Sequence, residues 1–121
     1  MSGADLRGAR LEGWELEAVT LYGANLSEAN LKGAYLMRAN LTDAILWRAN
    51  LEDSNLTDAN LRNANLRGAN LTNANLSRAN LEGANLEGAN VTNANVDSVD
   101  LRGANLNGVD LKSAFNSPRY I

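Results

Sequence analysis

The chain repeats itself every five residues. From Leu6 to Leu111 every fifth residue is apolar, and 20 of these 22 positions hold Leu while two hold Val. Two residues before each of them stands Ala in 17 cases, and the residue between is Asn in 14 cases. The unit therefore has the pattern Ala-Asn-Leu-x-x, as in residues 59–63. Because nothing breaks the phase between residues 4 and 114, the sequence predicts one repeat domain without a linker.

A period of five residues fits neither an α-helix nor a continuous strand. On a helix, successive Leu residues would lie about 140° apart and would form no apolar stripe. In one strand, an odd period would send successive Leu side chains to opposite faces. The pattern is satisfied if Ala and Leu point inward, Asn points outward, and the x-x pair turns the chain at a corner. The second corner residue is Gly in nine repeats, as a turn with positive φ favours.

The charged residues indicate how many repeats make one coil. If a coil holds four pentapeptides, residues 20 apart are stacked about 4.8 Å from each other, where like charges would repel. Eight charged pairs occur at this spacing, and all eight have opposite signs, for example Lys32–Glu52 and Asp58–Arg78. Spacings of 10, 15 and 25 residues each bring some like charges together. The sequence therefore predicts a four-sided coil.

The predicted architecture is an all-β solenoid of about five and a half coils of four pentapeptides over residues 1–114, with a capping tail at 115–121. Side-chain hydrogen bonds of the Asn columns are expected to fix the turns and the stacked coils. Four residues of the tail are expected to fold over the open core: Phe115, Pro118, Tyr120 and Ile121. In the first coil Trp14 and Val19 replace Ala. Either they plug that end from within, or the first coil stacks on a second copy or a partner.

The Ala-Asn-Leu-x-x unit, as in residues 24–28 through 104–108, closely resembles the A(D/N)LXX motif of pentapeptide repeat proteins. The resemblance covers about 110 of the 121 residues. It implies a right-handed quadrilateral parallel β-helix, in agreement with the four sides that the charges predict. Proteins of this family are especially abundant in cyanobacteria, and most have no known biochemical activity. A minority inhibit DNA gyrase and protect it from quinolones by imitating the shape and charge of DNA.

The composition excludes several kinds of catalytic and metal site. The chain has no Cys and no His, so it lacks a thiolate nucleophile and the commonest general base and metal ligand of proteins. The remaining carboxylates, such as Asp53 and Asp58, are expected on convex outer walls, whereas paired catalytic carboxylates need a cleft. We therefore expect no enzyme activity, no metal, no cofactor and no small-molecule substrate.

The net charge of −3 argues against contact with nucleic acid and against its imitation. A nucleic-acid-binding surface needs an excess of basic residues, whereas a DNA mimic of this length, about 26 Å, would need about 15 negative charges. Gyrase inhibition is therefore the alternative function rather than the favoured one. No apolar run has the length of a membrane helix, about 20 residues, and no signal peptide is visible. We expect a cytoplasmic protein without membrane contact.

The favoured function is a non-enzymatic scaffold that binds an unidentified protein through its walls or ends, as a monomer or a weak end-stacked dimer. The candidate contacts are outward apolar residues: Tyr22, Tyr35, Met37, Ile45 and Trp47. Tyr35 and Met37 are expected on one wall, Tyr22 on the next, and Ile45 and Trp47 on the wall opposite Tyr35, so they form no single patch. Trp47 is the strongest candidate because Trp is enriched at interface hot spots.

Overall fold

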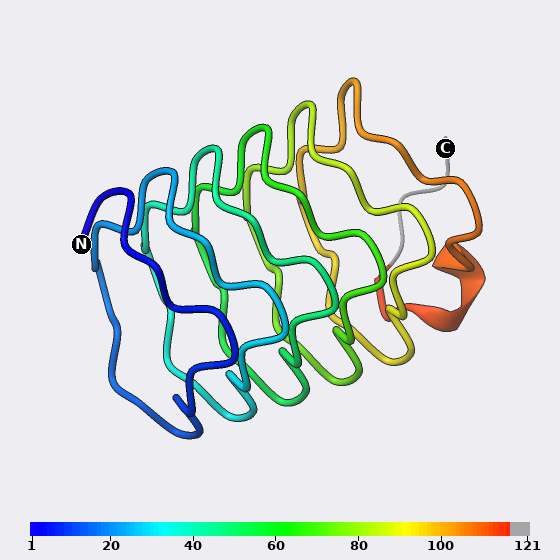
Figure 1. Ribbon diagram of the computed structural model, residues 1–121. Coiled ribbons are helices and arrows are strands. Elements are labelled where there is room, and N and C mark those ends of the chain that lie inside the picture. Colours follow the sequence, from blue (N-terminus) through cyan, green and yellow to red (C-terminus); the bar gives the residue numbers. More distant parts are fainter. Residues whose placement is uncertain (117–121) are drawn as a thin grey trace.

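Every pentapeptide forms one side of a square coil. In the computed structural model, which describes residues 1–116, the central residue of a side pairs in parallel with the residue 20 positions later. Eighteen such bridges run from Asp5–Asn25 to Asn95–Phe115. The coils stack into a tube from the N-terminal end to the C-terminal end (Figure 1). The four sides predicted from the charges are confirmed, and the fold is a right-handed quadrilateral β-helix.

We number the four walls in chain order by their central residues. Wall 1 carries residues 5, 25, 45, 65, 85 and 105, wall 2 carries 10, 30, 50, 70 and 90, wall 3 carries 15, 35, 55, 75, 95 and 115, and wall 4 carries 20, 40, 60, 80 and 100. A two-residue corner joins each wall to the next. The one helix among the described residues is the 3₁₀ helix η1, Leu111–Ser113, beyond the last complete coil.

A fixed set of main-chain hydrogen bonds joins each side to the coil before it. The Asn25 N–H donates to the Ala4 carbonyl at 2.9 Å, and the Asn25 carbonyl accepts from the Leu6 N–H at 2.8 Å. The second corner residue adds a bond, as from the Gly8 N–H to the Ser27 carbonyl at 2.9 Å. The backbone N–H and C=O groups of a central residue both point toward the preceding coil. The two faces of a coil therefore present different backbone groups to their neighbours.

Each corner is a tight turn closed by a main-chain hydrogen bond, as between the Ala9 N–H and the Leu6 carbonyl at 3.0 Å. The second corner residue has a positive φ, between 54° and 75°, at every corner from residue 3 to residue 108. All ten Gly residues stand at this position, which confirms the expected turn. Other corners hold residues such as Ala18 and Arg48 in the left-handed region, at a cost of about 1–2 kcal/mol each.

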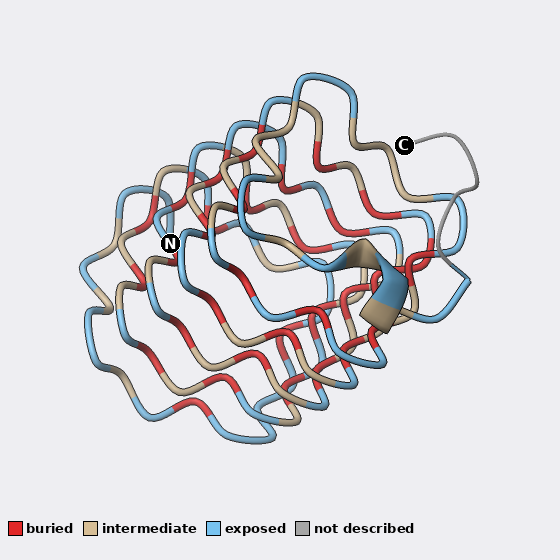
Figure 2. Ribbon diagram, turned by 90° about the vertical axis from the view of Figure 1, so that its right-hand side faces the viewer, coloured by how far each residue is buried: buried red, intermediate tan, exposed pale blue. Residues whose placement is uncertain are grey.

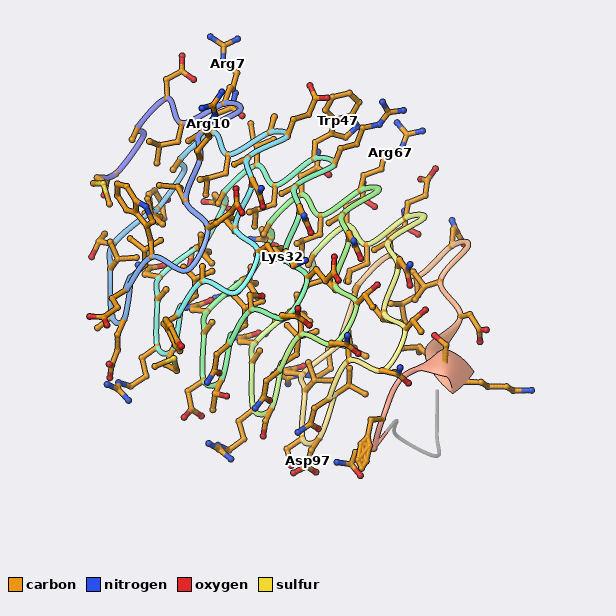
Figure 3. All side chains as sticks on the ribbon, turned by 90° about the horizontal axis from the view of Figure 1, so that it is seen from below. Arg7, Arg10, Lys32, Trp47, Arg67 and Asp97 are labelled. Carbon is orange, nitrogen blue, oxygen red and sulfur yellow. The ribbon has the colours of Figure 1, made fainter. Side chains whose placement is uncertain are left out.

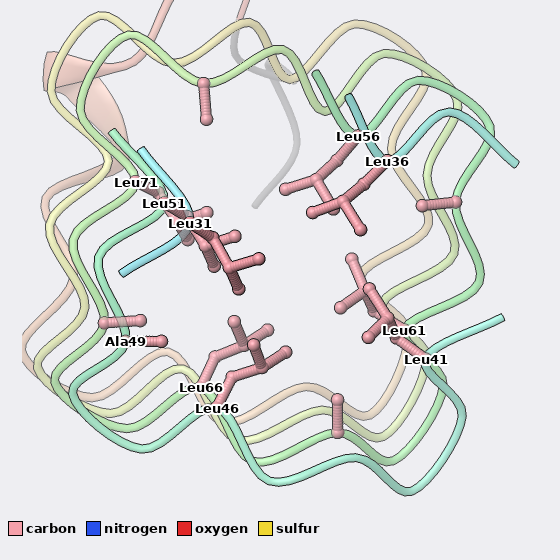
Figure 4. Close-up of a cluster of buried hydrophobic side chains, with 14 of the residues drawn as sticks. Leu31, Leu36, Leu41, Leu46, Ala49, Leu51, Leu56, Leu61, Leu66 and Leu71 are labelled. Atoms are coloured by element: carbon pink, nitrogen blue, oxygen red, sulfur yellow. The ribbon is translucent and has the colours of Figure 1, made fainter. Parts of the chain in front are cut away.

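Leu and Ala side chains fill the tube. From Leu21 to Val96 every inward residue is at most 4% exposed, and Figure 2 shows buried stretches along the walls with exposed corners between them. The central and corner side chains surround the tube (Figure 3). Inside it, Leu residues 20 apart form columns that face one another across the core (Figure 4). Ser54 replaces Ala in one repeat, and its buried hydroxyl donates to the Leu51 carbonyl at 2.7 Å.

The regular coil ends at η1. Wall 2 is displaced there, so no bridge joins residues 90 and 110. The chain then returns to wall 3, where the Phe115 N–H donates to the Ala94 carbonyl at 2.7 Å. Phe115 thus takes an outward central position and is 55% exposed, so its ring extends wall 3 and does not cover the core. The other residues expected in the cap lie outside the described residues: Pro118, Tyr120 and Ile121.

Candidate interaction surface

The central Asn side chains fix the corners. In Asn60 the Oδ1 atom accepts from the backbone N–H of Arg62, two residues later, at 3.1 Å. All 14 central Asn residues make the same bond. The expected role of the Asn columns in fixing the turns is confirmed, whereas these 14 bonds stay within one repeat and do not join stacked coils. The candidate sites for contact with a partner are therefore the positions where the wall or corner departs from this pattern.

Opposite charges alternate along the corner columns. Five of the eight pairs predicted from the 20-residue spacing form ion pairs, including Arg78–Asp58 at 2.9 Å and Arg67–Glu87 at 3.6 Å. By donating hydrogen bonds, the Arg78 guanidinium lowers the pKa of the Asp58 carboxyl below its usual value. Exposed pairs of this kind contribute little stability, but a slipped coil would replace them with like-charge contacts.

The five candidate contact residues lie on separate parts of the tube. Tyr22, Tyr35 and Ile45 are exposed, and Met37 and Trp47 are half-buried. Tyr35 and Met37 border one hollow of about 390 Å³ on wall 3. The register places Ile45 and Trp47 on wall 1 and its corner, opposite Tyr35, and Tyr22 at the corner between walls 4 and 1. The candidates form no single patch.

Tyr22 is engaged within the fold. The Asp43 carboxylate of the next coil accepts from its phenol hydroxyl and, through this bond and its charge, raises the pKa of Tyr22 above the ordinary value. The ring remains about half exposed. Its hydroxyl therefore already has a charged neighbour within the fold, the Asp43 carboxylate.

A groove of about 260 Å³ lies beside Trp47, at the corner between walls 1 and 2. Its lining residues are Trp47, Arg48, Arg67, Gly68, Glu87 and Gly88. The Arg48 guanidinium lies over the indole, 4.7 Å from the ring centroid. Trp47 and Arg67 follow one another along this edge of the tube in Figure 3. We call this site the Trp47 groove.

The Trp47 groove exists because two stacked corner positions lack a side chain. Gly68 and Gly88 follow Arg48 in the column of second corner residues. A Cβ atom at Gly68 would come within 3.3 Å of the Arg48 Cγ atom, which would press on the Arg48 side chain. Trp47 could be singled out from the sequence, whereas the groove was not predicted. The signal in the sequence was two Gly residues 20 apart, Gly68 and Gly88. They stand in the same corner column as Arg48, the residue that follows Trp47.

The surface offers aromatic, guanidinium and carboxylate groups for contact. Among residues 1–116, no three His, Cys, Asp or Glu residues gather to hold a metal ion. Every buried side-chain nitrogen or oxygen of these residues has a hydrogen-bond partner. No helix in the described part of the chain has the length and apolar character needed to cross a bilayer.

Comparison with known proteins decides the family. The family model of pentapeptide repeats matches residues 1–36, 34–73 and 74–113. The chain belongs to the pentapeptide repeat family. The resemblance found in the Ala-Asn-Leu-x-x units is thereby confirmed over most of the chain. No curated protein matches this pentapeptide repeat protein.

Several solved pentapeptide repeat proteins are similar to it. Rfr23 from the cyanobacterium Cyanothece 51142 is 47% identical with a TM-score of 0.72, and the match covers 79% of this chain and 63% of that one. A thylakoid-lumen protein of Arabidopsis thaliana is 35% identical, with a TM-score of 0.81 over 84% of this chain and 70% of that one. HetL from Nostoc sp. strain PCC 7120 is 30% identical, with a TM-score of 0.54 over 94% and 73%. The chain thus spans less than two thirds of Rfr23.

Proposed function

We propose that this pentapeptide repeat protein is a non-enzymatic scaffold that binds another protein through the Trp47 groove. The observation that carries the proposal is the stacked Trp47–Arg48 pair beside a groove that two Gly residues leave open. Trp and Arg are among the residues most enriched at interface hot spots, which lie in pockets that exclude water. HetL, a relative involved in the regulation of heterocyst differentiation, supports a regulatory rather than a catalytic role.

The charges around the groove indicate the chemistry of the partner segment. Arg67 is paired with Glu87 at 3.6 Å, whereas Arg48 forms no ion pair among the described residues. The Arg48 guanidinium therefore has donors to offer to a carboxylate. Ile45, on the same wall, is 37% exposed and adds apolar surface. These contacts favour a partner segment with an Asp or Glu next to an apolar side chain.

The alternating corner columns favour protein contact over DNA mimicry. Arg62, Glu82 and Arg102 stack in one column, and Glu82 contacts both Arg residues, at 3.7 Å and 3.4 Å. Alternating charges give a weak, short-ranged field, whereas a DNA mimic needs a continuous negative surface. The net charge of −3 is spread over the whole chain.

The substitution Trp47→Ser tests the proposal, because Ser27 stands in the same column and the repeat accepts it. Proteins from the source cells are captured on the wild-type chain, and each purified partner is then titrated against wild type and variant. We expect the affinity of the true partner to fall about tenfold or more, as for truncation of a hot-spot residue.

The matched control is Tyr35→Asn, which removes an exposed aromatic ring from the opposite wall in favour of the residue found at Asn55. A partner that uses the Trp47 groove should bind this control like wild type. A partner lost only with Tyr35→Asn would place the contact on wall 3 and refute the groove. Equal binding to all three forms would refute both walls as contact sites.

A further inference from the structure

We propose that wall 2 binds an extended segment of a partner protein in a gap of its β ladder, between Asn90 and η1. The site is distinct from the Trp47 groove, which lies along the corner before wall 2 and shares only Gly88 with it. Three observations carry the proposal. Two backbone groups of wall 2 lack a main-chain partner among residues 1–116, a hollow lies in front of them, and their spacing along the strand fits one residue of an extended chain.

The ladder of wall 2 is interrupted after Asn90. Toward the preceding coil it is complete, because the Asn90 N–H donates to the Ala69 carbonyl at 2.9 Å and the Asn90 carbonyl accepts from the Leu71 N–H at 2.7 Å. Toward the following coil, the Ala89 carbonyl and the Val91 N–H make no equivalent main-chain bond within residues 1–116. Figure 1 shows the reason, since η1, the short orange-red helix, carries the chain away from the regular coil.

The interruption lies between intact hydrogen bonds. On one side of it, the Gly88 N–H donates to the Asn107 carbonyl at 2.9 Å. On the other side, the Asn93 N–H donates to the Ser113 carbonyl at 2.8 Å. The following coil thus leaves the ladder at η1 and rejoins it at Ser113. The gap is therefore a property of η1 within the sheet, with paired backbone before and after it.

The two free backbone groups belong to buried residues. Ala89 is 4% exposed and Val91 is 3% exposed. Buried backbone N–H and C=O groups are almost always paired in folded proteins, and a partner that supplies the missing hydrogen bonds binds favourably. Asn90, which lies between them, is exposed, whereas Asn70 in the same column is half-buried. The gap is therefore open toward the outside of wall 2.

A hollow of about 260 Å³ occupies the gap. It is lined by the strand residues Ala89 and Val91 and, across the gap, by Asp110 and Ser113. Pockets that hold whole small molecules have volumes of about 300–1,000 Å³. This hollow is smaller, so it fits a short stretch of backbone better than a cofactor or a drug-sized ligand.

The spacing of the free groups selects an extended segment. The Ala89 carbonyl and the Val91 N–H belong to residues two apart, and both face the following coil. At the other bridges of wall 2, one residue of the following coil satisfies this pair of groups by donating from its N–H and accepting at its C=O. One residue of a partner segment that runs parallel to wall 2 makes the same two bonds. In strand addition of this kind the main-chain hydrogen bonds supply the affinity.

The surroundings of the gap restrict the sequence of the segment. The pairing residue needs an N–H, which excludes Pro. Its two neighbours point toward the core, where Val109 and Leu111 already pack, so they have to be small. Asp110 lines the hollow and forms no ion pair within residues 1–116, so a basic side chain at the pairing position is favoured. The partner segment is therefore an extended stretch with Lys or Arg between two small residues.

Hydrogen exchange of the full chain, followed by nuclear magnetic resonance, tests whether the gap is free. The Val91 amide proton is expected to exchange about tenfold or more faster than that of Leu86. Leu86 stands at the same position of the repeat in the same coil, and its N–H donates to the Asn105 carbonyl at 2.8 Å. Equal protection of the two amides would mean that the chain itself fills the gap, and the proposal would be wrong.

The peptide acetyl-Gly-Ala-Lys-Ala-Gly-amide is the probe for binding. At millimolar concentration it is expected to shift the Val91 amide signal and to slow the exchange of this amide by about tenfold. The control is the same peptide with a methyl group on the main-chain nitrogen of Lys, which keeps the charge but cannot donate to the Ala89 carbonyl. The control should have no effect. An unchanged Val91 signal with the first peptide, or equal effects of both peptides, would refute the pairing.

Two matched variants locate the peptide on the tube. Gly108→Asn places a side chain beside the hollow, because a Cβ atom there lies 3.6 Å from the Gly88 backbone nitrogen, and Asn already occupies such a positive-φ corner at Asn93. It should abolish the response of Val91 to the peptide. Gly8→Asn makes the same change in the same corner column, where a Cβ atom meets nothing within 4 Å, and should respond like wild type.

Unchanged exchange at Leu86 shows that each variant is folded. A response that survives Gly108→Asn would place the peptide elsewhere and would overturn the proposal. Trp47→Ser should leave the response of Val91 to the peptide unchanged, because Trp47 does not line this hollow. The proposal for the Trp47 groove and the proposal for the gap can therefore fail separately.

Discussion

The first coil and the middle coils share one repeat but are held together differently. In the middle coils, from Leu21 to Val96, inward side chains are at most 4% exposed, and each coil bonds to a coil on either side. In the first coil Leu6 is only partly buried and Trp14 is 53% exposed, and within residues 1–116 its main chain bonds to one neighbouring coil. The pentapeptide thus produces a closed core only where a coil has neighbours on both sides, as expected for a solenoid.

The two regions also differ in the residues that occupy the central positions of their walls. From Asn50 to Asn95 every central residue is Asn, and each one accepts a hydrogen bond from its corner. In the first coil Asp5 makes this bond, at 3.3 Å, while Arg, Glu and Thr occupy the other central positions. The central side chains of the middle coils therefore stiffen the corners, whereas in the first coil Asp5 is the one described central residue that makes this bond.

Truncation of an inward Leu should have the largest effect and should separate the two regions. Leu61→Ala is expected to cost about 3–5 kcal/mol, because it leaves a cavity in a fully buried part of the core. Leu6→Ala is expected to cost less than about 2 kcal/mol, because a partly exposed site can relax. Guanidinium denaturation followed by circular dichroism measures both. Equal costs would mean that the first coil is packed as tightly as the middle.

Backbone conformation at the corners should have the next largest effect, with opposite signs for removing and for introducing Gly at a positive φ. Gly88→Ala is expected to cost about 1 kcal/mol through its φ of +68° alone, because the new Cβ would meet no atom within 4 Å. Ala18→Gly, at a φ of 58° in the first coil, should stabilise by up to about 1 kcal/mol. Denaturation midpoints compare the two. A loss of stability with Ala18→Gly would show that the first coil relaxes its turn in solution.

The corner hydrogen bond of the central Asn should have a smaller effect. Asn60→Ala removes the acceptor of the Arg62 N–H and is expected to cost about 1 kcal/mol. Thr20→Asn places that acceptor in the same column of the first coil and should add about 0.5 kcal/mol. Thr20→Ala is the matched control, because it shortens the side chain without adding an acceptor. Thermal denaturation of the three variants would contradict this account if Thr20→Asn behaved like Thr20→Ala.

The fold could be predicted from the sequence because two independent patterns agree. The inward Leu positions require a turn in every five residues, and pairs such as Lys32–Glu52 require a return after 20. The phase of the repeat also placed Tyr35 and Ile45 correctly on opposite walls. These features depend only on spacing along the chain, which the sequence shows directly.

Features that depend on side-chain contacts, or on a break in phase, could not be predicted in this way. Arg48 covers the indole of Trp47, and its position depends on Gly68, 20 residues away. At the C-terminal end, Asp110 accepts from the Lys112 N–H at 3.1 Å at the start of η1. Phe115 nevertheless keeps the phase of the repeat, 20 residues after Asn95, and takes its place on wall 3 instead of in the predicted cap.

Tyr22, at the border between the two regions, should show the smallest effect. The Gly3 N–H donates to its carbonyl at 2.8 Å, and Asp43 accepts from its hydroxyl and raises its pKa. The folded chain holds this proton more tightly than the unfolded chain. The contact therefore stabilises the fold below the ordinary pKa of about 10, and its contribution is lost as pH rises through the raised value.

Asp43→Asn should bring the pKa of Tyr22 back toward the ordinary value. Phenolate absorbance, measured with Tyr35 and Tyr120 replaced by Phe, follows Tyr22 alone. Identical titrations with and without Asp43 would mean that the second and third coils are not joined at this corner in solution, and the border between the regions would then lie one coil further into the tube.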